Sequence, residues 1–220
     1  FATGEKDAVV FQAMEGAALM IFADVSSSMT YYPDNLEYSK GFIRDVVVSL
    51  LVSSAHQMMS PVGLVLFSDK VERVFPPQSG EYALHILNQF LSEEPRTEGA
   101  ATALSCIKND AIGFQESMIC IVSDFQDENI NKSWLAGLTG TELDLIPIII
   151  RDPLEKISFP KGAQLFCDNP ETGEKLPLYI SRRDFALMRE EADRHYEKVC
   201  ELFCALRAEP VILDTADIND

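Results

Sequence analysis

The chain has 220 residues and a formal net charge of −17 at pH 7, because 35 acidic residues outnumber 18 lysines and arginines. An acidic surface repels nucleic-acid phosphates and anionic lipids, so it disfavours both as partners and favours cations or basic protein patches. Hydrophobic residues make up 47% of the sequence, which argues against a disordered chain, and the length suits one large α/β domain.

Strands and helices are predicted to alternate in the first half of the chain. In chain order, we expect a strand over residues 17–23, a helix over 36–58, a strand over 61–67, its antiparallel hairpin partner over 70–75 and a helix over 82–91.

The strands over 17–23 and 61–67 are continuous apolar runs, which are typical of strands buried on both faces. The dipeptide Pro76-Pro77 is expected to close the hairpin.

Helical spacing also predicts which side chains the first two helices bury. In the helix over 36–58, Ile43 and Leu50 belong to the expected apolar face, and in the helix over 82–91 that face includes Leu84 and Leu91.

The second half of the chain continues the same alternation. We expect a helix over 103–112, a strand over 117–122, a weaker helix over 129–138, a strand over 143–150, an irregular segment with short strands over 153–181, a charged helix over 183–207 and a last strand over 210–213. Alternating strands and helices predict a parallel sheet covered by helices on both faces. We therefore predict a single domain over residues 1–220, with its core in about 17–152 and 183–214 and an insertion over 153–183.

Polar residues follow the predicted core strands where each strand ends. The stretch "IFADVSSSM" places Asp24, Ser26 and Ser28 after the first strand, and Ser123-Asp124 follows the strand over 117–122. Sites in open α/β sheets form beyond the carboxyl ends of the strands, so these side chains are expected to meet there. Carboxylate and hydroxyl oxygens are hard ligands that suit Mg²⁺ or Ca²⁺ rather than zinc. We predict a divalent-cation site with little negative charge among its ligands, to which a partner's carboxylate could bind.

The sequence Asp24-Val-Ser26-Ser-Ser28 resembles the D-x-S-x-S motif of the metal-ion-dependent adhesion site in von Willebrand factor A domains. The resemblance implies a Rossmann-like, three-layer fold with a mostly parallel six-stranded sheet and one antiparallel edge strand. It also implies a threonine ligand from a second loop and an aspartate from a third. Asp124 in "ICIVSD" matches the third loop, and Thr102 in "GAATAL" is preferred over Thr97 for the second.

Further stretches resemble one bacterial branch of that family, whose members are encoded beside MoxR-type AAA+ ATPases. They are "PVGLVLFSDKVERVFPPQSG", "IVSDF", "IRDPLE" and "CDNPETGE". This resemblance implies a non-enzymatic binding module that works with such an ATPase in assembling or activating other complexes. The expected metal residues are Asp24, Ser26, Ser28, Thr102 and Asp124, holding Mg²⁺ or another divalent cation such as Mn²⁺ or Ca²⁺. Both ends of the chain look trimmed relative to that branch.

The sequence features also bear on two other functions. A metal-free scaffold, in which the motif only shapes its loop, remains open. A haloacid-dehalogenase-type phosphatase also places an aspartate after the first strand, but it needs a second aspartate two residues later, where this chain has Ser26. We therefore expect no enzymatic activity.

The five cysteines predict a reducing compartment, because their number is odd and the chain is not small. No apolar run approaches the roughly 20 residues that cross a bilayer. We expect a cytoplasmic protein.

Overall fold

The structure is a computed structural model that describes residues 18–30, 39–92, 104–107, 117–127, 130, 144–151, 164–168, 175–179 and 182–214. The strands are β1 (Leu19–Asp24), β2 (Val62–Phe67), β3 (Val71–Gln78), β4 (Met118–Ser123), β5 (Asp144–Arg151), β6 (Gln164–Asp168), β7 (Lys175–Tyr179) and β8 (Val211–Asp214). The α-helices are α1 (Ser27–Thr30), α2 (Lys40–Gln57), α3 (Glu81–Ser92) and α6 (Arg182–Cys204), and Leu104–Cys106 forms a 3₁₀ turn.

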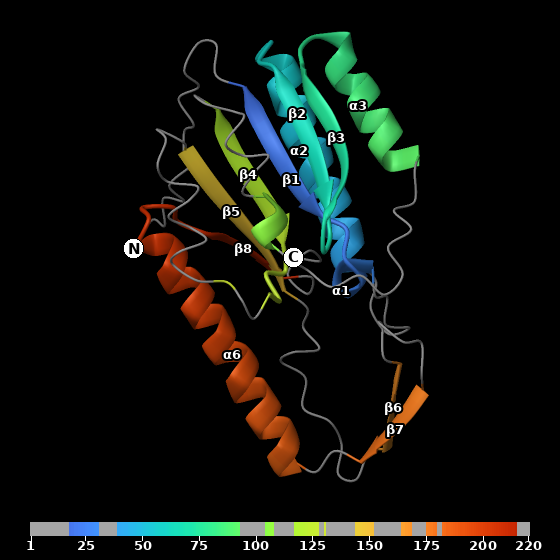
Figure 1. Ribbon diagram of the computed structural model, residues 1–220, viewed down its shortest axis with the longest axis vertical. Helices are drawn as coiled ribbons and strands as arrows, with labels where there is room; N and C mark the ends of the chain where they lie inside the picture. The colour runs from blue at the N-terminus through green and yellow to red at the C-terminus, as the bar shows by residue number, and fades with distance from the viewer. Residues whose placement is uncertain are drawn as a thin grey trace, which may run out of the picture.

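Within these residues, six strands form one sheet in the order β3-β2-β1-β4-β5-β8 (Figure 1). Strands β2, β1, β4, β5 and β8 run parallel, and β3 lies antiparallel to β2 at one edge. The structure thus confirms the predicted fold class, a Rossmann-like α/β fold with a mostly parallel sheet and one antiparallel edge strand. The central strands form because β1, β2 and β4 are apolar runs that the sheet buries on both faces.

Two hydrophobic clusters, one on each face of the sheet, make up the core. On one face, Ile21 of β1 and Leu64 of β2 pack with side chains of α2 and α3. On the other face, Phe22 of β1 and Ile121 of β4 pack with the carboxyl-terminal half of α6, including Phe203. The helices therefore cover both faces of the sheet, which gives three layers.

The expected end of the hairpin at Pro76-Pro77 is wrong, because β3 continues through both prolines to Gln78. The register shifts there, since Phe75 pairs with Leu64 and Gln78 pairs with Val62. Three residues of β3 thus advance against two of β2. Edge strands and bulges tolerate proline, because their backbone is not required to donate to a strand on each side.

The predicted buried faces of two helices are wrong in part. Helix α3 buries Ala83, Ile86 and Phe90, whereas Leu84 and Leu91 are exposed. Helix α2 buries Ile43 as predicted, but Leu50 is exposed. Both helices carry apolar residues around much of their circumference, so spacing did not single out the face that meets the sheet.

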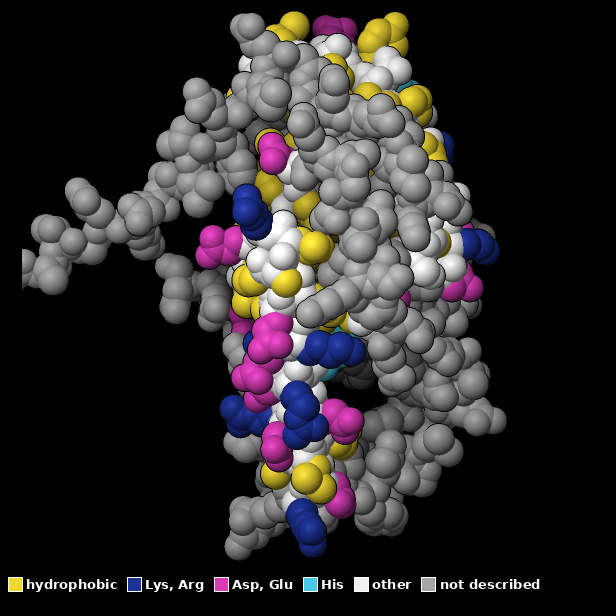
Figure 2. All heavy atoms as spheres, turned by 60° about the vertical axis from the view of Figure 1, so that its left-hand side comes forward, with side chains coloured by type: hydrophobic (Ala, Val, Ile, Leu, Met, Phe, Trp, Pro, Cys, Tyr) yellow, Lys and Arg dark blue, Asp and Glu magenta, His cyan; other side chains and the backbone are white. Residues whose placement is uncertain are grey.

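The charged helix predicted over 183–207 is confirmed as α6, and Figure 2 shows its basic and acidic side chains interspersed along its outer surface. Arg194 and Glu190 form an ion pair there at 3.3 Å between Nη2 and Oε1. The irregular segment contains the antiparallel pair β6 and β7, in line with the expected short strands. Nearly all of the helix predicted over 129–138 lies outside the described residues. Among the described helices, none is long and apolar enough to cross a membrane.

Candidate metal centre

Strands β1 and β4 lie side by side and bring their carboxyl ends to the same edge of the sheet (Figure 1). Ala23 pairs with Val122, so Asp24 and Ser123 come level with each other at the strand ends. Asp24, Ser26 and Asp124 are fully buried, and Ser28 is partly exposed. The structure thus brings four of the five predicted site residues to one edge.

Asp24 accepts hydrogen bonds on both carboxylate oxygens. The Ser26 backbone N–H donates to Oδ1 at 2.9 Å, and the Ser123 hydroxyl donates to Oδ2 at 2.6 Å. The first bond closes a tight turn at the motif, which aspartate favours because its side chain can bond the backbone two residues on. The second bond ties the ends of β1 and β4 together across the sheet.

Arg44 of α2 also supports the motif. Its Nη1 donates to the backbone carbonyl of Asp24 at 3.1 Å, and its guanidinium is almost completely buried. The same guanidinium pairs with Asp45 at 2.7 Å between Nη2 and Oδ1, so Arg44 supports the turn through a hydrogen bond while Asp45 compensates its charge.

The two motif hydroxyls, Ser26 Oγ and Ser28 Oγ, share a hydrogen bond at 3.1 Å, a separation that two neighbouring ligands of one small cation could also have. Adjacent oxygens of a Mg²⁺ octahedron, with bonds of 2.0–2.1 Å, are about 3 Å apart. The donor set is made of carboxylate and hydroxyl oxygens, so its chemistry fits a hard divalent cation.

Burial and like charge act together on the Asp24 carboxyl. Desolvation is the largest cause and the nearby Asp124 carboxylate the second, and they raise the pKa of Asp24 to about 6. Hydrogen bonds from Ser123 and Ser26 oppose this rise in part. The ionised pair Asp24 and Asp124 is therefore unfavourable unless a positive charge lies beside it.

A lysine that the sequence did not point to supplies such a charge. Lys40, the first residue of α2, places its Nζ 2.6 Å from Asp124 Oδ2. The lysine side chain is 11% exposed and the aspartate carboxylate 0%, so the ion pair is buried. The other oxygen of Asp124 accepts the Gln126 N–H at 3.3 Å.

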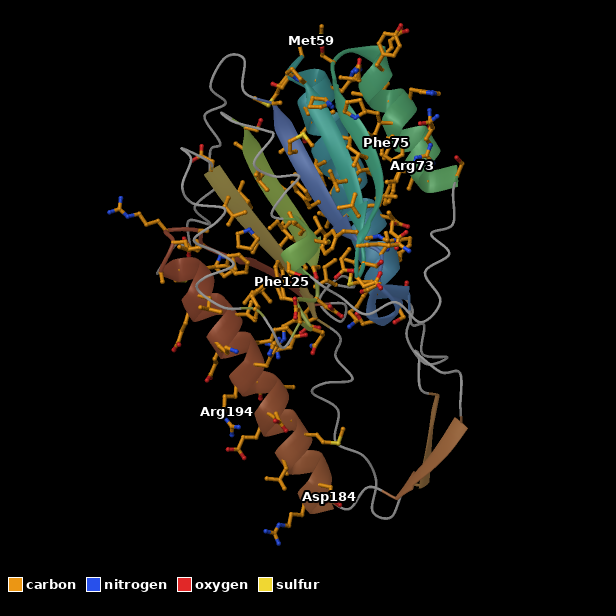
Figure 3. All side chains as sticks on the ribbon, in the orientation of Figure 1. Met59, Arg73, Phe75, Phe125, Asp184 and Arg194 are labelled. Carbon is orange, nitrogen blue, oxygen red and sulfur yellow. The ribbon has the colours of Figure 1, made fainter. Side chains whose placement is uncertain are left out.

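The chain turns sharply after Asp124, at Phe125. This residue has a left-handed backbone with φ of 54°, which is uncommon for a bulky side chain. Its N–H donates to Ser123 Oγ at 2.9 Å, and its carbonyl lies 2.7 Å from His195 Nε2 of α6. Figure 3 labels Phe125 at the end of β4 beside α6. Its ring packs edge-on against that of Phe203, with 5.2 Å between the two ring centroids. Helix α6 therefore holds the turn that carries Asp124.

The predicted threonine ligand is not tested. Thr102 and its rival Thr97 lie outside the described residues. Leu104, two residues after Thr102, donates its backbone N–H to Asp127 Oδ2 at 3.0 Å. Asp127 is buried and follows Asp124 by three residues, so it ties the second loop to the third.

Asp69 lies in the turn after β2, where it is exposed and accepts the Ser68 hydroxyl at 3.1 Å. The described residues include no group of three or more His, Cys, Asp or Glu side chains that could hold a metal ion. A cation at this edge would thus need hydroxyl and water oxygens in addition to Asp24 and Asp124.

Sequence reasoning missed Lys40, Arg44 and Asp127 as parts of the site. Asp127 could have been found, since it follows Asp124 closely on a loop after a core strand. The two basic residues lie in the first turns of α2, where the sequence does not distinguish them from solvated positions until the helix is docked.

The sheet order defines a Rossmann-like α/β fold with a mostly parallel sheet, which is consistent with the fold of von Willebrand A domains. The chain matches the family model described as "Protein of unknown function DUF58" over residues 8–198, and it therefore belongs to that family.

Two solved structures share this fold. The conserved hypothetical protein BatB from Bacteroides thetaiotaomicron is 15% identical with a TM-score of 0.57, covering 90% of this chain and 91% of that one. An aerotolerance-related membrane protein from Bacteroides fragilis is also 15% identical with a TM-score of 0.54, covering 93% and 97%. No curated protein matches the chain. At this level of identity the likeness concerns the fold.

Proposed function

We propose that this chain is a divalent-cation-dependent protein-binding module without enzymatic activity. The observation that carries the proposal is the pair of buried carboxylates, Asp24 and Asp124, at the ends of adjacent strands beside the Ser26 and Ser28 hydroxyls. Asp24, Ser26, Ser28 and Thr102 would hold Mg²⁺, Mn²⁺ or Ca²⁺ directly or through water, and Asp124 would complete or orient the set. The bound cation would supply a positive centre that a carboxylate can bind.

The partner would contribute an aspartate or glutamate side chain to that centre. A divalent cation held by two carboxylates and neutral hydroxyls keeps coordination positions that water fills, so a further carboxylate oxygen can bind there. A MoxR-type AAA+ ATPase, or a complex that it assembles, is the partner that the sequence resemblance supports. We further propose a cytoplasmic location, which agrees with Cys120 and Cys200 being thiols.

Capture of a purified MoxR-type ATPase on the immobilised chain tests this function. With Mg²⁺ held constant, so that the ATPase keeps its own cation, the wild-type chain should retain the ATPase and Asp24→Ala should not. Asp69→Ala is the matched control, because it removes an exposed carboxylate at the same sheet edge and should retain the ATPase like wild type. Equal retention by Asp24→Ala and wild type would contradict the cation-dependent mechanism.

The same proteins, together with Asp24→Asn, also test the enzymatic alternative. A phosphatase assay with Mg²⁺ should give no turnover above background for any of them. Turnover that disappears in Asp24→Asn would instead assign Asp24 as a nucleophile and overturn the proposal.

A further inference from the structure

The buried ion pair between Lys40 and Asp124 joins two residues that are 84 positions apart in sequence. The distance of 2.6 Å between Nζ and Oδ2 is that of a strong charge-assisted hydrogen bond. Burying a lysine is costly unless a carboxylate compensates it, so the lysine lies here because Asp124 does.

Helix formation does not explain this lysine. The amino-terminal end of a helix carries a partial positive charge and favours acidic residues, yet the first turn of α2 has none and begins with Lys40. The N-cap is already provided by Ser39, whose hydroxyl accepts the Phe42 N–H at 3.0 Å. The position is therefore unfavourable for the helix and favourable only for the carboxylate edge of the sheet.

The start of α2 is also held close to the metal motif. A Cβ placed on Gly41 would lie 2.9 Å from the backbone oxygen of Met29, so the absence of a side chain permits this approach. The Lys40 ammonium thereby reaches Asp124 from a helix start that packs directly on α1, the turn that contains Ser28 (Figure 1).

We propose that Lys40 is a built-in counter-ion of this site, which holds Asp124 when no divalent cation is bound and competes with the cation for that carboxylate. Two positive charges on one buried carboxylate repel each other strongly, so the ammonium has to leave Asp124 Oδ2 as the cation enters. The site then has two states, one in which Lys40 pairs with Asp124 and one in which the cation is bound. This inference rests on the proposed cation site.

The test is a calorimetric titration of Mn²⁺ into wild type and Lys40→Met, with thermal unfolding measured in EDTA and in Mn²⁺. Methionine keeps the length of the lysine stem and removes the charge. We expect Lys40→Met to bind Mn²⁺ at least tenfold more tightly than wild type and to unfold at a lower temperature in EDTA. The rise in unfolding temperature on adding Mn²⁺ should be larger for Lys40→Met than for wild type.

Two further variants keep the test decisive. Lys70→Met is the matched control, because Lys70 is an exposed lysine beside Glu72 at 3.8 Å and its loss changes net charge by the same amount. Lys40→Gln retains a hydrogen-bond donor for Asp124 and serves if Lys40→Met does not fold in EDTA. The affinity of Lys70→Met for Mn²⁺ should equal that of wild type, and that of Lys40→Gln should exceed it.

The outcomes separate this inference from the proposed function. If wild type binds Mn²⁺ and both Lys40 variants bind it equally or more weakly, competition by Lys40 is refuted and the cation site stands. The same holds if the affinity for Mn²⁺ increases in Lys70→Met as much as in the Lys40 variants. If neither wild type nor the Lys40 variants bind Mn²⁺, both ideas are overturned. Binding by the Lys40 variants alone would support the built-in counter-ion and contradict cation-dependent binding by the wild-type chain.

Discussion

At the residue scale, the site brings together two buried carboxylates that repel each other when both are ionised. Asp24 is buried against the Ser123 hydroxyl, and the charge of Asp124 acts on it across the ends of two strands. Hydrogen bonds orient these carboxylates but do not neutralise them. Lys40 compensates the charge of Asp124, but the ionised form of Asp24 remains unfavourable beside them.

The raised pKa of Asp24 predicts how stability depends on pH in EDTA. The folded state binds more protons than the unfolded state between pH 3.8 and about 6, so this residue lowers the free energy of unfolding as pH rises through that window and contributes no further change above it. At about 1.4 kcal/mol per pKa unit, the contribution is up to about 3 kcal/mol.

Asp24→Asn should remove this dependence. Its amide oxygen can accept the Ser26 N–H and its amide nitrogen can donate to Ser123 Oγ, so both polar contacts have a neutral replacement. The free energy of unfolding of the variant, relative to wild type, should be higher at pH 7 than at pH 4, as urea denaturation in EDTA would measure. Parallel pH curves for the two proteins would show that Asp24 is not destabilised by burial and by Asp124.

At the scale of elements, continuous apolar runs made the sheet predictable. No polar face is present in residues 17–23, 61–67 and 117–122, so their composition predicted strands buried on both sides. Strands β1, β2 and β4 confirm this prediction. The faces of α2 and α3 were harder, because both helices have apolar residues on more than one side.

The part of the site that lies directly after the strand ends could be predicted from the sequence. Asp24 and Asp124 come directly after β1 and β4, and the register of two neighbouring strands brings them together. The Lys40 contact depends on how α2 docks on the sheet, which no local spacing encodes.

The contact between α1 and the start of α2 gives a prediction for Gly41→Ala. Alanine normally stabilises a helix by up to about 1 kcal/mol relative to glycine, but here its Cβ would meet the Met29 carbonyl at 2.9 Å. The backbone has to move, so we expect a net loss of about 1–3 kcal/mol. Chemical denaturation would measure it.

Ser54→Ala is the control for this substitution, because Ser54 is an exposed position of the same helix. It should be neutral or slightly stabilising. A stability of Gly41→Ala equal to that of Ser54→Ala would mean that α2 does not need its close approach to the motif.

At the scale of the whole molecule, the net charge of −17 attracts any cation. Weak, non-specific accumulation of Mg²⁺ over an acidic surface has to be separated from binding at one site. Salt screens the first effect over about 8–10 Å at 0.10–0.15 M ionic strength, while a buried site is screened much less. Saturation at fixed ionic strength therefore distinguishes the two.

The most direct test of the central claim is a calorimetric titration of Mg²⁺ into wild type and Asp24→Asn at matched ionic strength. The variant keeps nearly all of the surface charge, so it reports the non-specific contribution. We expect one saturable site in wild type and none in Asp24→Asn. Equal heats in both proteins, or no saturable binding in wild type, would contradict a metal centre at the end of β1.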